Sequence, residues 1–255
     1  MASRGISLKH SLHLLVVGSI GGPLWDPAMS KFTGLTTKKK IHLICELKKA
    51  SPSEGVLRES FDPKILAREF ETAGASAISV LTERYYFKGD PKTLKLIRPI
   101  TTIPLLRKDF ILDAYQIYET TLLGADSFLL IVMLLTDSEL KQMLQLAGML
   151  KLDALDEIHT KEELERALWA GSEIIGINNR NLKTLQIDQS VSENLIRFVP
   201  KGIVAVIESG LETRKEIVRY QTLGARCFLI GTALMKSTNV KEKILEFQGQ
   251  SNGVV

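Results

Sequence analysis

The chain has 255 residues, of which 45% are hydrophobic and 24% are charged, so it can bury one sizeable core and has the composition of a soluble globular protein. Its formal net charge of +4 suits a small anionic substrate. A basic stripe interleaved with aromatic residues, as in nucleic-acid readers, is not found, so nucleic acid is not expected as a partner. Cys45 and Cys227 lie in apolar runs and are interpreted as reduced core thiols.

The first 40 residues are predicted to form an irregular or partly helical N-terminal arm. The segment Met1–Trp25 has no acidic residue, and its apolar run Leu12–Val17 is too short to span a membrane. A targeting segment within residues 1–28 is the alternative, which would place the protein in an organelle instead of the cytoplasm. Residues 249–255 are expected to form a C-terminal tail.

From residue 41 to residue 248, short apolar runs alternate with longer amphipathic runs. The short runs are typical of buried parallel strands: Ile41–Cys45, Ala77–Leu81, Pro104–Leu106, Ser127–Val132, Leu152–Leu155, Glu173–Ile177, Ile203–Ile207 and Arg226–Ile230. The amphipathic runs between and after them are predicted helices, for example 62–74, 113–124, 137–149, 161–171, 190–198 and 212–224. Thr160 and Glu163 have the spacing of a capping box. Eight strand-helix units predict an α/β fold, the (β/α)₈ TIM barrel.

Polar side chains recur where the predicted strands end, at the face where such barrels carry out their chemistry. They are Glu46, Lys48, Lys108, Glu157, Asn178 and Glu208. The two-residue period of a strand puts Glu46 and Lys48 on one side, and it separates Lys108 from Arg107 and Asp109. Any one of them alone is more simply explained as solvated or paired with a neighbour, but their recurrence favours one site.

Small residues follow the last two predicted strands. Ser209 and Gly210 come after the seventh strand, and Gly231 and Thr232 come after the eighth, the latter at the start of a short predicted helix. Barrels of this type bind phosphate through backbone amides at these two positions. Each glycine alone is explained equally well by a turn, but together they favour a phosphorylated substrate.

Four sequence strings resemble signatures of the indole-3-glycerol phosphate synthase family, and the resemblance extends over about residues 41–235. They are Glu46–Ser53, Leu105–Phe110, Gly176–Leu182 and Glu208–Gly210. The resemblance implies a carboxy-lyase of tryptophan biosynthesis, which closes the ring of 1-(2-carboxyphenylamino)-1-deoxyribulose 5-phosphate with loss of CO₂ and water. It implies no metal and no organic cofactor, and it allows contact with other enzymes of the tryptophan pathway.

The same resemblance assigns the residue roles. Lys108 would be the general acid and Glu157 the general base, with Lys48 assisting. Glu46 and Glu208 would hold the lysines charged and oriented. Asn178 is implied to bind a substrate hydroxyl or carboxylate, and Arg180 and Ser51 the anthranilate carboxylate. Phe87 is implied to contact the aromatic ring, and Ser209 is a further implied substrate contact. The implied phosphate contacts are Gly210, Gly231 and Thr232.

Two departures from the family pattern keep other interpretations open. The N-terminal arm resembles the family only from Ser30 to Leu35, and Asp156 stands where an apolar residue is usual. The alternation places Asp156 toward the helices, where an unpaired carboxylate is costly. A catalytically weakened barrel retained for binding or assembly is therefore the alternative, and another phosphosugar isomerase or cyclase is the alternative among enzymes.

Overall fold

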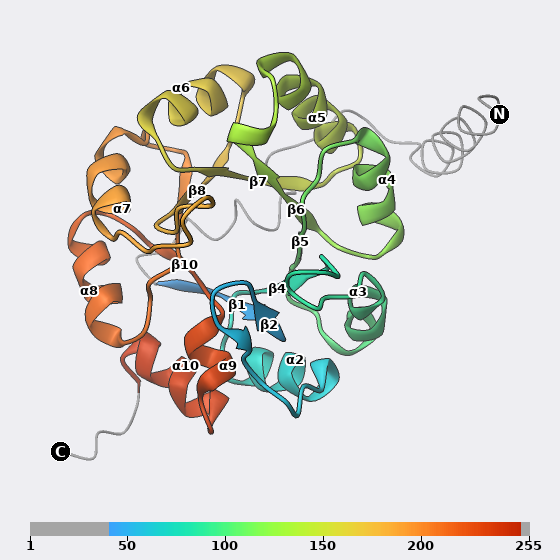
Figure 1. The fold of residues 1–255 in the computed structure, drawn as a ribbon, viewed down its shortest axis with the longest axis vertical. Helices are drawn as coiled ribbons and strands as arrows, with labels where there is room; N and C mark the ends of the chain where they lie inside the picture. Colours follow the sequence, from blue (N-terminus) through green and yellow to red (C-terminus); the bar gives the residue numbers. More distant parts are fainter. Residues whose placement is uncertain (1–40, 251–255) are drawn as a thin grey trace.

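The computed structural model describes residues 41–250, and these form a closed barrel of parallel strands with helices around it (Figure 1). The strands adjoin in the order β1-β10-β9-β8-β7-β6-β5-β4. Their bounds are β1 His42–Leu47, β4 Ala77–Leu81, β5 Leu105–Lys108, β6 Ser127–Ile131, β7 Asp153–Ile158, β8 Ile174–Asn178, β9 Val204–Glu208 and β10 Cys227–Ile230. The predicted TIM barrel is confirmed. The predicted N-terminal arm lies outside the described residues, as does most of the predicted tail.

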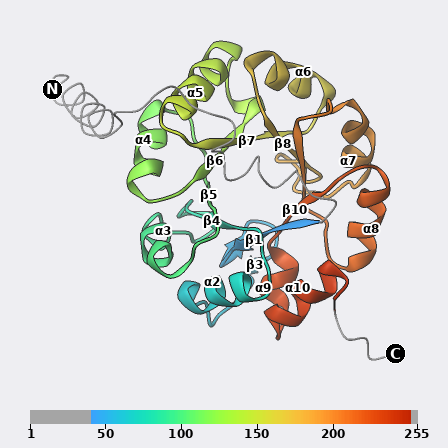
Figure 2. The ribbon, with the colours of Figure 1, turned by 180° about the vertical axis from the view of Figure 1, so that it is seen from behind.

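The helices form a continuous ring outside the strands, which is also visible from behind in Figure 2. They are α2 Pro63–Thr72, α3 Lys92–Ile97, α4 Ala114–Leu122, α5 Asp137–Met149, α6 Lys161–Ala170, α7 Ser190–Leu195, α8 Arg214–Thr222, α9 Thr232–Lys236 and α10 Val240–Gln248, with 3₁₀ turns η3 Arg98–Ile100, η4 Val132–Leu134 and η5 Ile196–Phe198. Several helices are shorter than predicted because the capping residue stays outside. Asp62 and Asp113, for example, accept backbone N–H groups of the first turn.

The capping box predicted at α6 forms only in part. The Thr160 hydroxyl accepts a hydrogen bond from the backbone N–H of Glu163 at 3.2 Å. The Glu163 carboxylate, however, accepts from the backbone N–H of His159 at 2.6 Å instead of from Thr160. The reciprocal bond of a capping box is thus displaced by one residue.

The apolar side chains form two cores, as the alternation along a barrel strand requires. One core fills the space between the strands and the helices, and it includes Ile78, Phe128 and Ile175. The smaller one fills the barrel interior, and it includes Leu106 and Leu155. Both cysteines are buried and free.

Five strands, β1, β5, β7, β8 and β9, extend further toward their C-terminal ends than the apolar runs predicted. Glu46, Lys108, Glu157, Asn178 and Glu208 are strand residues, and Lys108, Asn178 and Glu208 are the last residues of their strands. A charged side chain can occupy a barrel strand when it faces partners in the interior, because its backbone still pairs with the neighbouring strands. Apolar composition alone therefore placed the C-terminal ends of these five strands too early.

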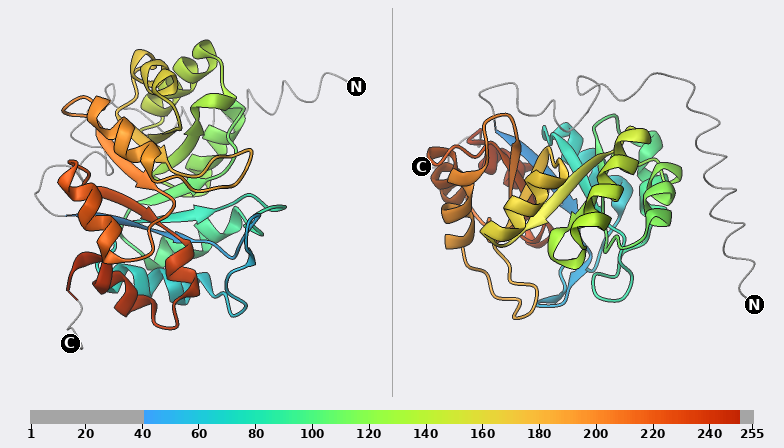
Figure 3. Two further views of the ribbon diagram at one scale, coloured as in Figure 1. Left: turned by 60° about the vertical axis from the view of Figure 1, so that its left-hand side comes forward. Right: turned by 90° about the horizontal axis from the view of Figure 1, so that it is seen from above.

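Three connections project from the same end of the barrel in the right-hand view of Figure 3. They are the hairpin of β2 (Ala50–Ser51) and β3 (Gly55–Val56), the loop of residues 82–91 after β4, and the loop after β8. This end carries the C-terminal ends of the strands. Within residues 41–250, no helix is long and apolar enough to cross a membrane.

Candidate active site

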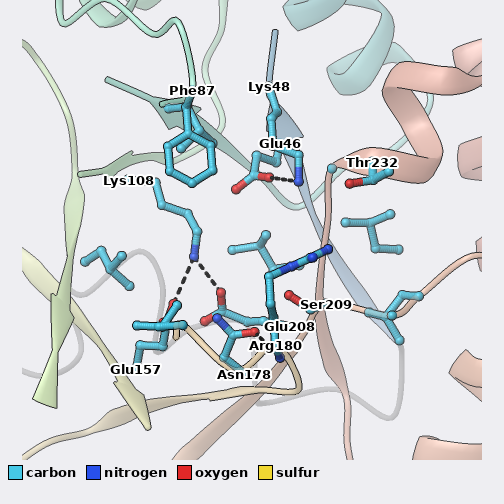
Figure 4. Close-up of a pocket in the computed structure, with 18 of the residues that line it drawn as sticks. Glu46, Lys48, Phe87, Lys108, Glu157, Asn178, Arg180, Glu208, Ser209 and Thr232 are labelled. Carbon is cyan, nitrogen blue, oxygen red and sulfur yellow. Dashed lines mark hydrogen bonds and ion pairs between the residues drawn. The ribbon is translucent and has the colours of Figure 1, made fainter. Parts of the chain in front are cut away.

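A cavity opens at the C-terminal end of the barrel, and the six polar residues that were predicted at strand ends all line it. They are Glu46, Lys48, Lys108, Glu157, Asn178 and Glu208. Figure 4 shows two groups of charges in this cavity. Lys48 and Glu46 lie together on one side, and Lys108 lies with Glu157 and Glu208 on the other. Barrel closure thus collects side chains from β1, β5, β7, β8 and β9.

Lys108 lies between two carboxylates. Its Nζ is 2.6 Å from Oε2 of Glu208 and 3.2 Å from Oε2 of Glu157. Burial alone would lower the pKa of Lys108, but the charges of Glu208 and Glu157 outweigh it and raise the pKa well above its ordinary value. Lys108 is therefore a protonated ammonium group, with 14% of its side chain exposed to the cavity.

A second acid-base pair lies on β1 and just beyond it, where Lys48 Nζ is 3.2 Å from Oε2 of Glu46. Gly231 leaves the space for this carboxylate, because a Cβ on Gly231 would lie 2.2 Å from Glu46 Oε2. The sequence attributed Gly231 to phosphate binding alone. The geometry adds a second reason, since any side chain there displaces Glu46.

Glu157 is held by three neighbours. Besides Lys108, its carboxylate interacts with the amide of Asn178, and its Oε1 is 3.6 Å from Nε2 of His159. Burial would raise the pKa of Glu157, but Lys108 and His159 outweigh it and lower the pKa below its ordinary value. Glu157 is consequently an ionised carboxylate, able to accept a proton.

His159 also contacts the site, through Glu157, and it was not among the predicted site residues. Its Nδ1 is 3.5 Å from the carboxylate of Glu163, so the imidazole lies between two acids. Burial would lower the pKa of His159, but Glu163 and Glu157 raise it overall. A histidine between two carboxylates is favoured in its protonated form, which in turn favours the ionised form of Glu157.

Glu208 is in a different electrostatic position from Glu157. Burial raises its pKa to about 7, opposed by Lys108 and reinforced by the charge of Glu157. Its Oε1 lies against β8, where a Cβ on Gly176 would be 2.2 Å away. Gly176 therefore makes room for Glu208 as Gly231 does for Glu46.

The residues assigned to the substrate carboxylate are only partly brought together. Arg180 lines the cavity and donates to Oγ of Ser53 at 3.1 Å and to the carbonyl of Leu185 at 2.9 Å. Ser51 is buried in β2 and does not line the cavity. The side-chain oxygen Oδ1 of Asn178 accepts a hydrogen bond from the backbone N–H of Arg180 at 2.9 Å. The side-chain amino group of Asn178 is therefore directed at Glu157 and the cavity.

The residues assigned to phosphate, Gly210, Gly231 and Thr232, line the side of the cavity formed by β9 and β10, next to Ser209, which was assigned to the substrate. Ser209 and Gly210 have positive φ angles of 65° and 74°, and Gly231 and Thr232 begin α9. All four line the cavity. The start of a helix, where backbone N–H groups are unpaired, suits an anion such as phosphate.

Comparison with known proteins identifies the family. The family model of indole-3-glycerol phosphate synthase matches residues 27–247. The chain belongs to the indole-3-glycerol phosphate synthase family. It is 41% identical over 252 residues to the indole-3-glycerol phosphate synthase of Acetivibrio thermocellus, covering 97% of each chain. It is 50% identical over 199 residues to that of Campylobacter jejuni, covering 78% of this chain and 77% of the relative.

Solved structures of more distant proteins share the fold. 3-Hexulose-6-phosphate synthase from Salmonella typhimurium superposes with a TM-score of 0.67 at 11% identity, over 82% of this chain and 98% of that one. 3-Keto-L-gulonate-6-phosphate decarboxylase from Vibrio cholerae superposes with a TM-score of 0.62 at 14% identity, over 84% of this chain and 98% of that one. At these identities the likeness supports the barrel and nothing finer.

Asp156 lies on the helix-facing side of β7. Its neighbours in the strand register, Leu130 and Ile175, belong to the outer core. The Asp156 side chain is fully buried, and neither carboxylate oxygen makes a hydrogen bond of good geometry. Burial raises its pKa to about 7, and the nearby Ser172 hydroxyl opposes only part of that rise.

The apolar side chains that line the cavity were not identified as such from the sequence. They are Leu81, Phe110, Leu129, Ile131, Leu182, Ile187, Leu211, Leu229 and Ile230. Strand periodicity places Leu129, Ile131 and Leu229 inward, so that signal was available in part. A pocket that combines an apolar lining with convergent charges suits an aromatic ring that carries anionic groups.

Proposed function

We propose that this chain catalyses the synthesis of indole-3-glycerol phosphate from 1-(2-carboxyphenylamino)-1-deoxyribulose 5-phosphate. The observation that carries the proposal is Lys108, held protonated between Glu157 and Glu208, with the Lys48–Glu46 pair facing the same cavity. Two acids and one base within one pocket are what a condensation followed by a dehydration requires. Membership of the family supports the same reaction.

In the first step, the ring carbon that carries the carboxylate attacks the ketone carbon of the sugar. The new carbon-carbon bond forms as the ketone oxygen gains charge, and Lys108 donates a proton to that oxygen. The carboxylate then leaves as CO₂, and the electrons of the broken bond restore the aromatic ring. The contacts of Lys108 with Glu157 and Glu208 keep it charged and fix its direction.

In the second step, the hydroxyl group produced by condensation leaves as water. Glu157 takes a proton from the adjacent carbon, the former C1 of the sugar, and Lys48 protonates the departing hydroxyl. A double bond forms between the two carbons and completes the indole. The lowered pKa of Glu157 is consistent with a base that is ionised when substrate binds.

Substrate binding follows from the same geometry. We assign Arg180 to the anthranilate carboxylate, with Asn178 as a further donor, and Phe87 to the aromatic ring; all three line the cavity. The backbone amides of Gly210, Gly231 and Thr232 are assigned to the phosphate, with Ser209 beside them as a further substrate contact. A contact of Ser51 with the substrate stays a prediction, since Ser51 does not line the cavity.

The experiment is a steady-state assay of the full chain with this substrate, following indole fluorescence. Turnover by the wild type, lost in Lys108→Ala and retained in Lys183→Ala, an exposed lysine outside the cavity, supports the proposal. If folded wild-type protein binds the substrate without turning it over, the barrel is retained for binding, the alternative suggested by Asp156. Absence of both binding and turnover would reject the proposed substrate.

A further inference from the structure

The loop after β4 is organised around one carboxylate. Oε1 of Glu83 accepts a hydrogen bond from the backbone N–H of Tyr85 at 2.8 Å. Oε2 of Glu83 accepts from the N–H groups of Tyr86 at 2.7 Å and Phe87 at 3.1 Å. Three consecutive backbone donors thus converge on one ionisable side chain, and hydrogen bonds to a charged acceptor are stronger than neutral ones.

The base of this loop leaves little freedom. The backbone N–H of Gly89 donates to the carbonyl of Glu83 at 2.7 Å, which closes the loop on itself. A Cβ on Gly89 would lie 2.3 Å from the carbonyl oxygen of Leu81, so only glycine allows this approach. The loop therefore returns to the end of β4 at the point where it left.

The loop is also tied to the strand that carries Lys108. The backbone N–H of Thr82 donates to the carbonyl of Lys108 at 3.0 Å, and the Thr82 hydroxyl donates to Oδ2 of Asp109 at 2.6 Å. Asp109 is itself 3.2 Å from the guanidinium of Arg107. The position of the loop is consequently fixed relative to the site.

The result of this arrangement is a selective exposure of aromatic side chains. Tyr85 is 89% exposed and Tyr86 is 65% exposed, whereas Phe87 lines the cavity. Figure 4 shows the Phe87 ring turned into the cavity that Lys108 and Glu46 share. The three N–H groups bound by Glu83 belong to these three residues, so the carboxylate holds the backbone from which all three rings project.

We propose that Glu83 is a positioning residue, which holds Phe87 where it packs on the aromatic ring of the substrate. The inference rests on the proposed function, since that function supplies the aromatic ring. Glu83 acts through the backbone of the loop and takes no part in proton transfer. Its loss therefore weakens substrate binding and leaves the chemical step unchanged.

The test compares Glu83→Ala, Glu83→Gln, Phe87→Ala and the double variant, with Glu59→Ala as the control at an exposed loop glutamate. Loss of an aromatic contact is expected to raise KM about 3- to 10-fold in Glu83→Ala, with kcat within about 2-fold. Glu83→Gln is expected to be intermediate, because an amide keeps one acceptor oxygen. The double variant is expected to be no worse than Phe87→Ala, because both changes remove the same contact.

A second readout is independent of turnover. Trypsin cleaves after Arg84 and Lys88, both exposed in this loop, and mass spectrometry identifies the cleaved bonds. Cleavage at these two bonds is expected to be slow in the wild type and at least several-fold faster in Glu83→Ala, at an unchanged melting temperature. If Glu83→Ala unfolds, the milder Glu83→Gln serves in its place.

The two proposals fail differently. A wild type without turnover rejects the proposed function, while the cleavage rates still test the loop. Glu83 is not a positioning residue if the cleavage rates are unchanged, if kcat falls while KM does not, or if the effects of Glu83→Ala and Phe87→Ala multiply in the double variant.

Discussion

Replacement of Asp156 by valine is expected to stabilise the protein. The carboxyl group has an ordinary pKa of 3.8 and a pKa of about 7 when buried in the folded protein. This difference of about 3 units, at 1.36 kcal/mol per unit, gives an upper bound of about 4 kcal/mol for the cost of ionising Asp156 in the fold. Because water and side chains relax around a buried charge, we expect Asp156→Val to gain about 1–3 kcal/mol at pH 8.

The pH dependence identifies the cause. Between pH 3.8 and about 7 the unfolded chain loses the Asp156 proton while the folded protein keeps it, so wild-type stability falls as pH rises through this window. The advantage of Asp156→Val over the wild type is therefore expected to grow across the window and to level off above about pH 8.

Urea unfolding followed by circular dichroism at several pH values measures this advantage. Asp156→Asn is the matched variant, since it removes the charge but keeps a buried polar group, and it is expected to lose the pH dependence with a smaller gain. Activity is expected to change less than about 3-fold, because the side chain faces the helices. A destabilised Asp156→Val, or an advantage independent of pH, would refute this reasoning.

Three further predictions concern the cavity. Lys108→Ala and Glu157→Gln are each expected to lower kcat by about two to four orders of magnitude. Lys108→Arg is expected to be similarly inactive, because guanidinium is a poor proton donor. Activity of a variant near that of the wild type would remove the substituted residue from the mechanism. Gly176→Ala is expected to lower kcat about 100-fold, because the added Cβ would lie 2.2 Å from Oε1 of Glu208 and displace this carboxylate from Lys108. An unchanged kcat would show that the contact between Glu208 and Lys108 is dispensable. Inorganic phosphate is expected to compete with substrate at tens of millimolar, roughly the affinity of a fragment, and inhibition kinetics showing no competition would contradict a phosphate pocket.

Much of the site could be predicted because strand alternation is local. The two-residue period put Lys108 inward and Arg107 outward, and the structure shows Arg107 buried on the helix side against Asp109 and Glu119. The same period placed Asp156 among the helices. Each of these inferences needs only the strand that carries the residue.

The pairing of charges could not be predicted in the same way. The partners of Lys108 lie 49 and 100 residues away, and only closure of the barrel brings them together. The space that Gly176 and Gly231 leave for carboxylates depends likewise on neighbouring strands. The role of Glu83 in the loop after β4 was missed for a different reason. An isolated glutamate after a strand has no sequence signal that distinguishes it from a glutamate exposed to solvent.

The 3.2 Å contact between Lys108 and Glu157 has a consequence for recovery after turnover. In the proposed cycle Lys108 ends as a neutral amine and Glu157 ends as a carboxylic acid. One proton hop across the contact regenerates both groups without a water molecule. Decarboxylation takes up one proton per turnover, so only the proton lost by Lys48 must be replaced from bulk solvent.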